Sequence, residues 1–450
     1  MNVKIVSSIT VKPTYVPSLP PPTTAYVPLS SFDKVAYDLQ AGVIYVYRPT
    51  TIPAITTTLT QGLQRVLAIY RELAGRLGKN QKGEDVILLN DHGVKFVEAS
   101  VDCRFDQASS LLEPSRDTLS LHPPTKGIEE LFQVQITRFA CSTVVIGITA
   151  QHIVADGQSI GNFLVAWGRA CRGLDIGPLP LHDRLSFFTL RDPPEIEFDH
   201  LGKEYTNKKT LEDEAGRSNE VALDDLVMHK IHFSADFIEK LKARASPSFG
   251  PSYITSDEKR TSYSTFECLI AHLWRALTRA RMLDASEITQ MKIAVNGRPR
   301  MNPKVPNQYF GNLVLWARPT AKVTDLLNRP VSLVAELIHE GIVKIDDGYI
   351  RSFINFSETR FEQDSDVIPF PLGEKCPRCP NIEVYSWLKL PFCDLDFGFG
   401  SPYMFMPAHC PTEGILFVLP AHAGDGSIDV FATLFKDQLD AFRQYCHILD

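Results

Sequence analysis

The chain has 450 residues, of which 44% are hydrophobic and 22% charged, and its formal net charge is −7. This composition is typical of a folded globular protein, and the length exceeds one ordinary core, so we expect about two to three domains. The 46 lysines and arginines are scattered, and apolar runs stay short of the roughly 18 residues that would span a bilayer. The sequence therefore favours neither nucleic-acid binding nor a membrane protein.

The N-terminal stretch and the cysteines predict a cytoplasmic protein. The first 22 residues lack the apolar core of a signal peptide and the arginines of a usual mitochondrial presequence. Nine cysteines form an odd, sparse set, which is typical of free thiols in a reducing compartment.

Strands and helices alternate along the first half of the chain. Runs of β-branched and aromatic residues favour strands, and apolar residues at helical spacing favour helices. We expect strands over residues 3–13, 43–47, 86–89, 94–98, 132–139 and 144–151, and helices over residues 55–76 and 161–171. The sequence Asn90-Asp-His-Gly93 predicts a hairpin turn between the two strands beside it.

After a polar, aperiodic stretch over residues 193–223, which predicts a linker, the second half resumes the alternation. We expect strands over residues 229–233, 292–295, 310–317, 382–390, 415–420 and 427–435, and helices over residues 235–245, 265–281, 332–344 and from 436. Ser264 or Thr265 occupies the N-cap position of the helix over 265–281. The elements together predict an α/β fold.

A histidine and a carboxylate lie where one predicted strand ends and a helix begins, in His152-Ile-Val-Ala-Asp156-Gly157. Gly157 permits a turn, and Ser159 is a candidate N-cap for the helix. Imidazole titrates near neutrality, so His152 is a candidate general base. On local pattern alone, a structural histidine is the more frequent role of such a residue.

Two other patterns compete for the chemistry. Gly157-Gln-Ser159-Ile-Gly161 has the form of a nucleophile elbow, but no later acid and histidine stand out to complete a triad. Cys376-Pro-Arg-Cys379 could begin a zinc site, yet Cys393 and Cys410 have the wrong spacing to complete it. We therefore expect free thiols and no metal.

A second motif, Asp396-Phe-Gly-Phe-Gly400, lies far downstream. Together with the histidine motif it resembles the HxxxDG and DFGWG motifs of the plant BAHD acyl-CoA-dependent acyltransferases, with Phe399 at the tryptophan position. The resemblance covers the whole chain. Supporting matches are Leu73-Ala-Gly-Arg-Leu77, Tyr263-Ser-Thr-Phe-Glu267 with Trp274-Arg275, Asn296-Gly-Arg298, Tyr309-Phe-Gly-Asn-Leu313 and Ser386-Trp387.

The resemblance implies an α/β (α+β) fold of two chloramphenicol-acetyltransferase-like domains, each with a mixed sheet flanked by helices, around a central solvent channel. Residues 1–192 would form the first domain, 193–223 the crossover linker and 224–450 the second domain. The segment over about 396–421 would cross back onto the first domain's sheet.

The resemblance also assigns roles. His152 would be the general base, with Gly157 beside it, and Asp156 would orient the loop by pairing with Arg298. The expected structural supports are Asp396, Gly398 and Gly400. The oxyanion and acceptor pocket would be formed by Trp387, Ser386, Tyr385 and Glu383, and Tyr45 would line the acyl pocket. The residues expected to contact CoA are Ser264, Thr265 and Lys389. Acyl-CoA would be a co-substrate, with no bound cofactor.

Several stretches resemble the branch whose members join hydroxycinnamoyl groups to agmatine, putrescine, tryptamine or tyramine. They are Val11-Lys-Pro13, residues 88–91 and 96–99, residues 161–167 and Pro380-Asn-Ile-Glu-Val384. Agmatine and putrescine enzymes often carry an acid at the position of Tyr385. Glu383, two residues earlier on the same strand face, could replace that acid, or Tyr385 could select an aromatic amine.

We therefore expect a monomeric N-hydroxycinnamoyltransferase acting on small molecules. The alternatives are an O-acyltransferase that esterifies an alcohol such as shikimate or quinate, and a non-catalytic relative that binds ligands.

Overall fold

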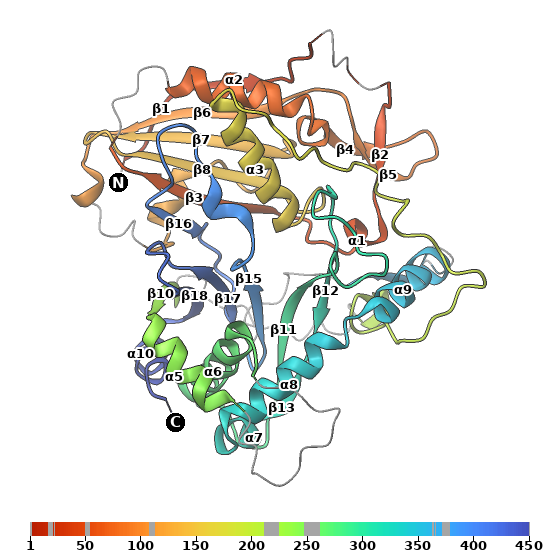
Figure 1. The fold of residues 1–450 in the computed structure, drawn as a ribbon, viewed down its shortest axis with the longest axis vertical. Coiled ribbons are helices and arrows are strands. Elements are labelled where there is room, and N and C mark those ends of the chain that lie inside the picture. The colour runs from red at the N-terminus through yellow and green to blue at the C-terminus, as the bar shows by residue number, and fades with distance from the viewer. Residues whose placement is uncertain are drawn as a thin grey trace.

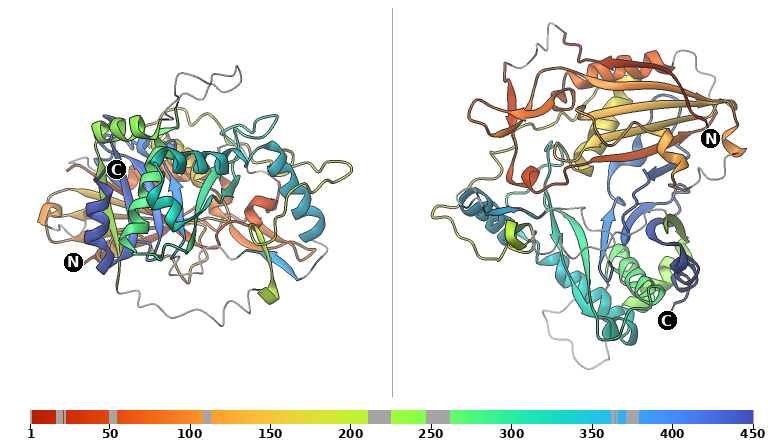
Figure 2. Two further views of the ribbon diagram at one scale, coloured as in Figure 1. Left: turned by 90° about the horizontal axis from the view of Figure 1, so that it is seen from below. Right: turned by 180° about the vertical axis from the view of Figure 1, so that it is seen from behind.

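The computed structural model describes residues 2–16, 21, 23–49, 55–107, 113–210, 225–246, 262–361, 364, 366–370 and 379–449. Two mixed sheets lie in separate lobes, one above the other in Figure 1, and helices pack on each. The rear view in Figure 2 places the N-terminus beside the first sheet and the C-terminus beside the helices of the second lobe. The predicted α/β class is confirmed.

The first sheet has the strand order β1-β6-β7-β8-β3-β16. Its strands are β1 (Lys4–Val11), β6 (Val94–Val101), β7 (Phe132–Phe139), β8 (Val144–Gln151), β3 (Gln40–Tyr47) and β16 (Met404–Pro407). All pairs are antiparallel except β6 with β7. Along β8, Ile146 and Ile148 pack in one apolar core with helices α2 (Ile55–Leu67) and α3 (Gly157–Cys171), whereas Val145 enters a second core on the other face.

Two predictions for this lobe are wrong. The helix expected over 55–76 ends at Leu67 and is followed by a 3₁₀ turn (Arg71–Ala74) and strand β4 (Arg76–Lys79). The expected hairpin does not form, because β5 (Asp85–Leu88) pairs with β2 (Tyr26–Pro28) and β4 in a separate three-stranded sheet. Asp91 and Gly93, at φ 52° and 91°, turn the chain from that sheet to β6.

The second sheet has the order β10-β18-β17-β15-β11-β12, and β13 also pairs with β11. Its strands are β10 (Leu226–Phe233), β18 (Ile428–Phe435), β17 (Ile415–Pro420), β15 (Ile382–Ser386), β11 (Ile288–Asn296), β12 (Val314–Ala317) and β13 (Thr320–Lys322). The helices of this lobe are α5 (Ala235–Ala245), α6 (Thr265–Ala280), α7 (Val323–Asn328), α8 (Val331–Val343) and α10 (Leu439–Cys446). Helix α6 carries the apolar face that the sequence predicts, with Leu273 and Trp274 fully buried.

Smaller elements complete the fold, and Figure 1 shows α1 (Ser31–Lys34) between the two lobes and α9 (Asp347–Asn355) at their side. The others are a π-helical turn (Phe356–Phe361) and the two-stranded pair β9 (Tyr205–Asn207) with β14 (Val367–Pro369). Residues 193–210 of the expected linker include β9, and the remainder of that linker lies outside the described residues.

The C-terminal segment connects the two sheets. Strand β16 pairs with β3 of the first sheet, and the next strand, β17, pairs with β15 and β18 of the second. Of the segment over 396–421 that was expected to cross back, the part that joins the first sheet is therefore Met404–Pro407. The domain boundaries remain a prediction. No helix within the described ranges has the length and apolarity to cross a membrane.

Candidate active site

His152 follows strand β8, and helix α3 begins five residues later at Gly157. The N-cap of α3 is Asp156, whose Oδ1 accepts a hydrogen bond from Ser159 N at 3.0 Å. The prediction that Ser159 caps this helix is wrong. Ser159 lies within the first turn, and Asp156 supplies the side-chain acceptor for its N–H at N3, which has no partner within the helix.

Asp156 and Arg298 form a buried, bidentate ion pair, as expected. Arg298 Nη1 lies 2.7 Å from Asp156 Oδ2, and Nη2 lies 3.0 Å from Oδ1. Leu313 N also donates to Asp156 Oδ2 at 3.0 Å. Burial alone would raise the pKa of Asp156, but Arg298 and the backbone donors hold it below its ordinary value. Asp156 is therefore an acceptor-only carboxylate whose two oxygens are both occupied.

Ser159 belongs to the same network and cannot serve as a nucleophile elbow. Its side chain is buried, its Oγ accepts from Arg298 Nη2 at 3.0 Å, and it donates to Gly311 O at 2.9 Å or Tyr309 O at 3.1 Å. A nucleophile elbow needs an exposed hydroxyl beside a base. The serine hydrolase alternative has no geometric basis here.

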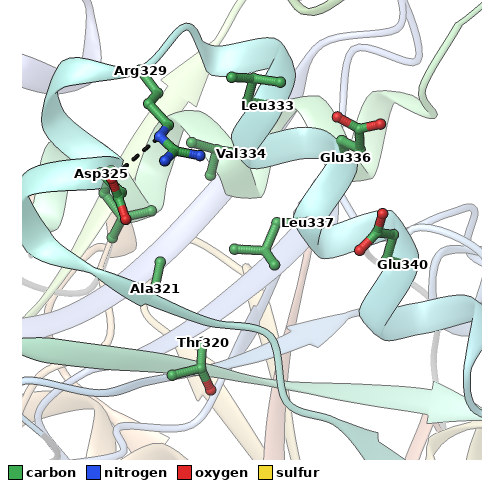
Figure 3. A pocket seen from close by; sticks show the side chains of 10 residues that line it. Thr320, Ala321, Asp325, Arg329, Leu333, Val334, Glu336, Leu337 and Glu340 are labelled. Carbon is green, nitrogen blue, oxygen red and sulfur yellow. Dashed lines mark ion pairs between the residues drawn. The ribbon is translucent and has the colours of Figure 1, made fainter.

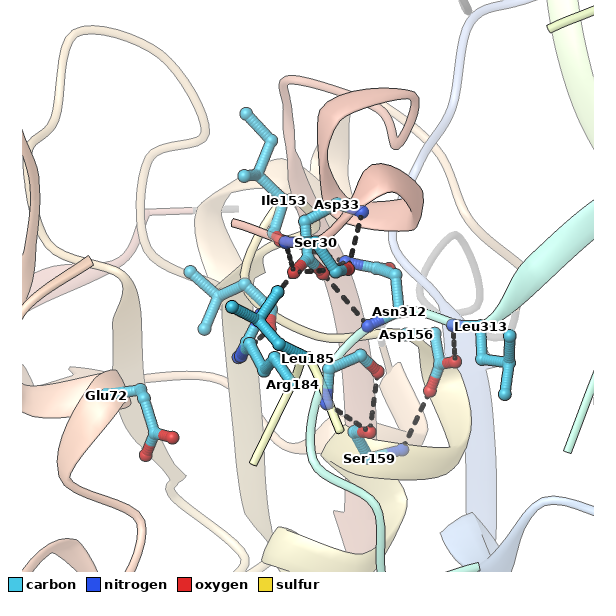
Figure 4. A network of polar contacts seen from close by, with 12 residues as sticks. Ser30, Asp33, Glu72, Ile153, Asp156, Ser159, Arg184, Leu185, Asn312 and Leu313 are labelled. Atoms are coloured by element: carbon cyan, nitrogen blue, oxygen red, sulfur yellow. Dashed lines mark hydrogen bonds and ion pairs between the residues drawn. The ribbon is translucent and has the colours of Figure 1, made fainter. Parts of the chain in front are cut away.

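A second buried network holds the backbone of the histidine loop from the other side (Figure 4). Asn312 Nδ2 donates to the carbonyl oxygens of residues 152 and 153, each at 2.9 Å, and Arg184 Nη2 donates to Val154 O at 2.7 Å. Asp33 bridges the two donors, because its Oδ2 accepts from Arg184 at 2.8 Å and its Oδ1 from Asn312 N and Nδ2 at 3.0 and 2.9 Å.

The sequence analysis did not predict a role for Asp33 or Arg184. It included Asn312 in a motif but assigned it no function. No short motif joins these residues, which lie far apart in the chain. The available signal was the Ser30-Ser-Phe-Asp33 segment, whose first serine and aspartate form a capping box.

The imidazole of His152 is half-buried and stands edge-on to the ring of Tyr37, with the centroids 5.9 Å apart. Burial lowers the pKa of His152 below 6.5, and the opposing effect of Asp156 is smaller. Its Nδ1 is buried and has no hydrogen-bond partner among the described residues. The ring is therefore neutral at pH 7, the protonation state that a general base requires.

Glu383 and Tyr385 lie on β15 and share one face, as the alternation predicts. The hydroxyls of Tyr385 and Tyr37 both donate to Glu383 Oε1, and Tyr385 Oη lies 2.8 Å from Tyr37 Oη. Glu383 is fully buried, and Lys292 Nζ lies 3.6 Å from its Oε2. Through Tyr37 this polar group is continuous with the His152 ring.

Trp387, one residue beyond β15, belongs to an aromatic cluster. Its ring centroid lies 5.1 Å from that of Phe392 and 5.6 Å from that of Phe405. Tyr45 is fully buried and stacks on Phe405 at 4.9 Å, so Phe405 lies in contact with both predicted pocket residues. Ser386 ends β15 and is half-buried.

Asp396 organises its own loop. Its Oδ1 accepts from Gly398 N at 2.8 Å and Gly400 N at 3.0 Å, and its Oδ2 pairs with Arg172 at 3.1 Å. Gly398 and Gly400 have φ values of 102° and 90°, which only glycine adopts without strain. A Cβ at Gly168 would lie 2.6 Å from Asp396 O, so this loop packs closely on α3.

The three expected CoA contacts lie elsewhere. Ser264 Oγ and Glu267 form the capping box of α6, with Oγ donating to Glu267 Oε2 at 2.7 Å. Thr265 is the first residue of that helix, and Lys389 is exposed beyond β15. Among the described residues, none of the three is hydrogen-bonded to the histidine loop, and their roles remain predictions.

The metal alternative gains no support within the part of the chain that is described. Cys376 lies outside it, Cys379 is exposed, and no group of three histidines, cysteines or acids there could hold a metal ion.

A cavity of about 290 Å³ between β13, α7 and α8 is drawn in Figure 3. None of the predicted catalytic residues lines it.

A model of the Transferase family matches residues 1–448. The chain belongs to the BAHD acyltransferase family. Agmatine coumaroyltransferase-1 of Hordeum vulgare is 44% identical, and putrescine hydroxycinnamoyltransferase 3 of Oryza sativa subsp. japonica is 43% identical; each alignment covers 100% of both chains.

Among solved BAHD-like folds, vinorine synthase superposes with a TM-score of 0.71 over 98% of this chain and 96% of that one, at 23% identity. This likeness confirms the expected α/β fold with two lobes. The family predicted from the His152 and Asp396 motifs is likewise confirmed.

Proposed function

We propose that this BAHD enzyme transfers a hydroxycinnamoyl group from CoA to a primary amine, with His152 as general base. The observation that carries the proposal is the loop of His152, whose three carbonyl oxygens, at residues 152–154, are fixed by Asn312 and Arg184. Burial holds the pKa of the imidazole below its ordinary value, which favours the neutral form. The amine-acylating relatives support the choice of acceptor class.

The amine nitrogen attacks the thioester carbonyl carbon and forms a tetrahedral oxyanion. His152 accepts the N–H proton as the C–N bond forms. When the C–S bond breaks, His152 returns the proton to the departing CoA thiolate, leaving an amide and free CoA. An alkylammonium ion, with a pKa of about 10 like that of lysine, must first lose a proton to become a nucleophile.

The other residues have supporting roles in this proposal. Asp156, occupied by Arg298, positions the loop and carries no proton. Trp387 and Ser386 border the oxyanion and Tyr45 the acyl chain, while Ser264, Thr265 and Lys389 face CoA in a channel between the lobes.

We also propose a cytosolic monomer. The eight cysteines in the described part of the chain are all free thiols, which supports a reducing compartment.

The test is thiol release from p-coumaroyl-CoA with agmatine, putrescine, tryptamine, tyramine or shikimate as acceptor, with products identified by mass. We expect an amide with at least one amine and no ester with shikimate. Esters alone would replace the proposal with the O-acyltransferase alternative. If none of these acceptors gives a product with p-coumaroyl-CoA or with other acyl-CoA donors, the non-catalytic alternative is favoured.

A further inference from the structure

Lys292 lies in an enclosed group of aromatic rings and one carboxylate beside the proposed base. Strands β11 and β15 run parallel and place Lys292 opposite Glu383. The ammonium lies 4.0 Å from the ring centroid of Trp316 and 5.4 Å from that of Tyr37, and it donates to Tyr37 Oη at 3.3 Å. The Lys292 side chain is only 12% exposed.

Aromatic faces around a carboxylate are the groups that proteins use to recognise a ligand ammonium. We call Tyr37, Trp316, Glu383 and Tyr385 the ammonium cage. Its rings are contiguous, because the Trp316 centroid lies 5.9 Å from that of Tyr37 and 5.6 Å from that of Tyr385. Tyr37 also contacts the His152 ring, so the cage lies directly beside the proposed base.

We infer that Lys292 is a specificity-determining residue that fills the ammonium cage with the chain's own cation, so that the acceptor must be a monoamine with an uncharged tail. The inference rests on the proposed function. Diamines and guanidinoalkylamines carry a second cation that would need this cage, whereas an aromatic monoamine such as tyramine or tryptamine does not.

The contacts of Glu383 support this exclusion. Its Oε1 accepts from two tyrosine hydroxyls, and its Oε2 faces the Lys292 ammonium. Burial and Glu383 raise the pKa of Tyr385 well above 10, so its hydroxyl keeps its proton and remains a donor. In the cage, the second cation of a diamine would lie in contact with the Lys292 ammonium. Because Lys292 already neutralises Glu383, the only carboxylate of the cage, this contact between like charges would be unfavourable.

The decisive variant is Lys292→Met, which keeps the length of the side chain and removes its charge, with Lys292→Arg as the matched control. With p-coumaroyl-CoA as donor, kcat/KM is measured for putrescine and agmatine and for tyramine and tryptamine. We expect wild type and Lys292→Arg to favour the monoamines, and Lys292→Met to raise the diamine-to-monoamine ratio on the order of tenfold or more. Adding Glu383→Gln to Lys292→Met should abolish the gain.

Putrescine binding measured by calorimetry without any donor gives a readout that is independent of acyl transfer. Lys292→Met should bind putrescine more tightly than wild type by a similar factor. If Lys292→Met fails to fold by circular dichroism, Lys292→Gln replaces it in both assays.

A wild-type enzyme that prefers putrescine or agmatine, or a Lys292→Met protein with unchanged selectivity and putrescine affinity, would overturn the inference while leaving amine acylation intact. If wild type acylates shikimate alone, the proposed function fails. The binding assay then decides the inference, since a gain in putrescine affinity supports the filled cage and its absence rejects it.

Discussion

His152 is held by its backbone rather than through its ring. Asn312 and Arg184 bind the carbonyl oxygens of residues 152–154, whereas Nδ1 of the imidazole has no hydrogen-bond partner among the described residues. The backbone of the loop is thus fixed by one neutral donor, Asn312, and one cationic donor, Arg184. Asp156 adds to this fixation through its ion pair with Arg298. Burial therefore outweighs the effect of Asp156, which raises the pKa of His152.

The lowered pKa of His152 gives a pH prediction. Because only the neutral imidazole accepts a proton, kcat/KM expressed per neutral amine should fall as pH drops through a value below 6.5 and stay flat above it. His152→Gln should remove this acid limb and reduce the rate by roughly 10²- to 10⁴-fold with an unchanged circular dichroism spectrum. An acid limb centred above 6.5, or retained turnover in the variant, would contradict the general-base role.

The Asp156–Arg298 pair gives a stability prediction. Arg298→Met leaves the buried carboxylate of Asp156 without its cation, which should cost about 3–5 kcal/mol in the free energy of unfolding measured with urea. Arg172→Met is the matched control, since it breaks the half-exposed pair with Asp396 and should cost about 0–1 kcal/mol. Adding Asp156→Asn to Arg298→Met should recover part of the loss; strictly additive costs would show that the two residues do not interact.

In helix α6, the capping role of Ser264 can be distinguished from its predicted contact with CoA. Ser264→Ala removes the capping box with Glu267 and should cost about 1 kcal/mol in unfolding free energy. Ser234→Ala removes the N-cap of α5 and should cost a similar amount. If Ser264 also contacts CoA, only Ser264→Ala raises KM for the acyl-CoA donor. Equal KM values in both variants would limit Ser264 to the cap.

Across the whole molecule, the two sheets share an apolar core around Met406 of β16. Ile44 and Val46 of the first sheet and Leu419 and Phe431 of the second belong to this core with Met406. The crossover strand therefore joins the lobes by burial as well as by its pairing with β3.

Met406→Ala tests that connection. Met406 is fully buried, so the substitution should lower the free energy of unfolding by about 2–5 kcal/mol. Met282→Ala is the matched control, because Met282 is 88% exposed and should change stability by about 0.5 kcal/mol or less. Thermal and urea unfolding provide both values. Equal effects of the two substitutions would show that β16 does not stabilise the lobes.

The sequence by itself determined the features that local spacing encodes. Runs of β-branched and aromatic residues predicted β7 and β8, and apolar residues at helical spacing predicted α5 and α8. The position of His152 after a strand followed from the apolar run before it. The capping box at Ser264 was readable because its partner is three residues away. The motifs around His152 and Asp396 were sufficient to predict the family.

The tertiary structure decided what depends on partners far apart in the chain. Asp33, Arg184 and Asn312 meet around the histidine loop, and Lys292 meets Glu383 only because β11 pairs with β15. The predicted hairpin failed for the same reason: the pairing of β5 and β6 is set by β2, β4, β1 and β7. Local patterns fix which residues can form a strand or a cap, but burial and long-range pairing choose the partners.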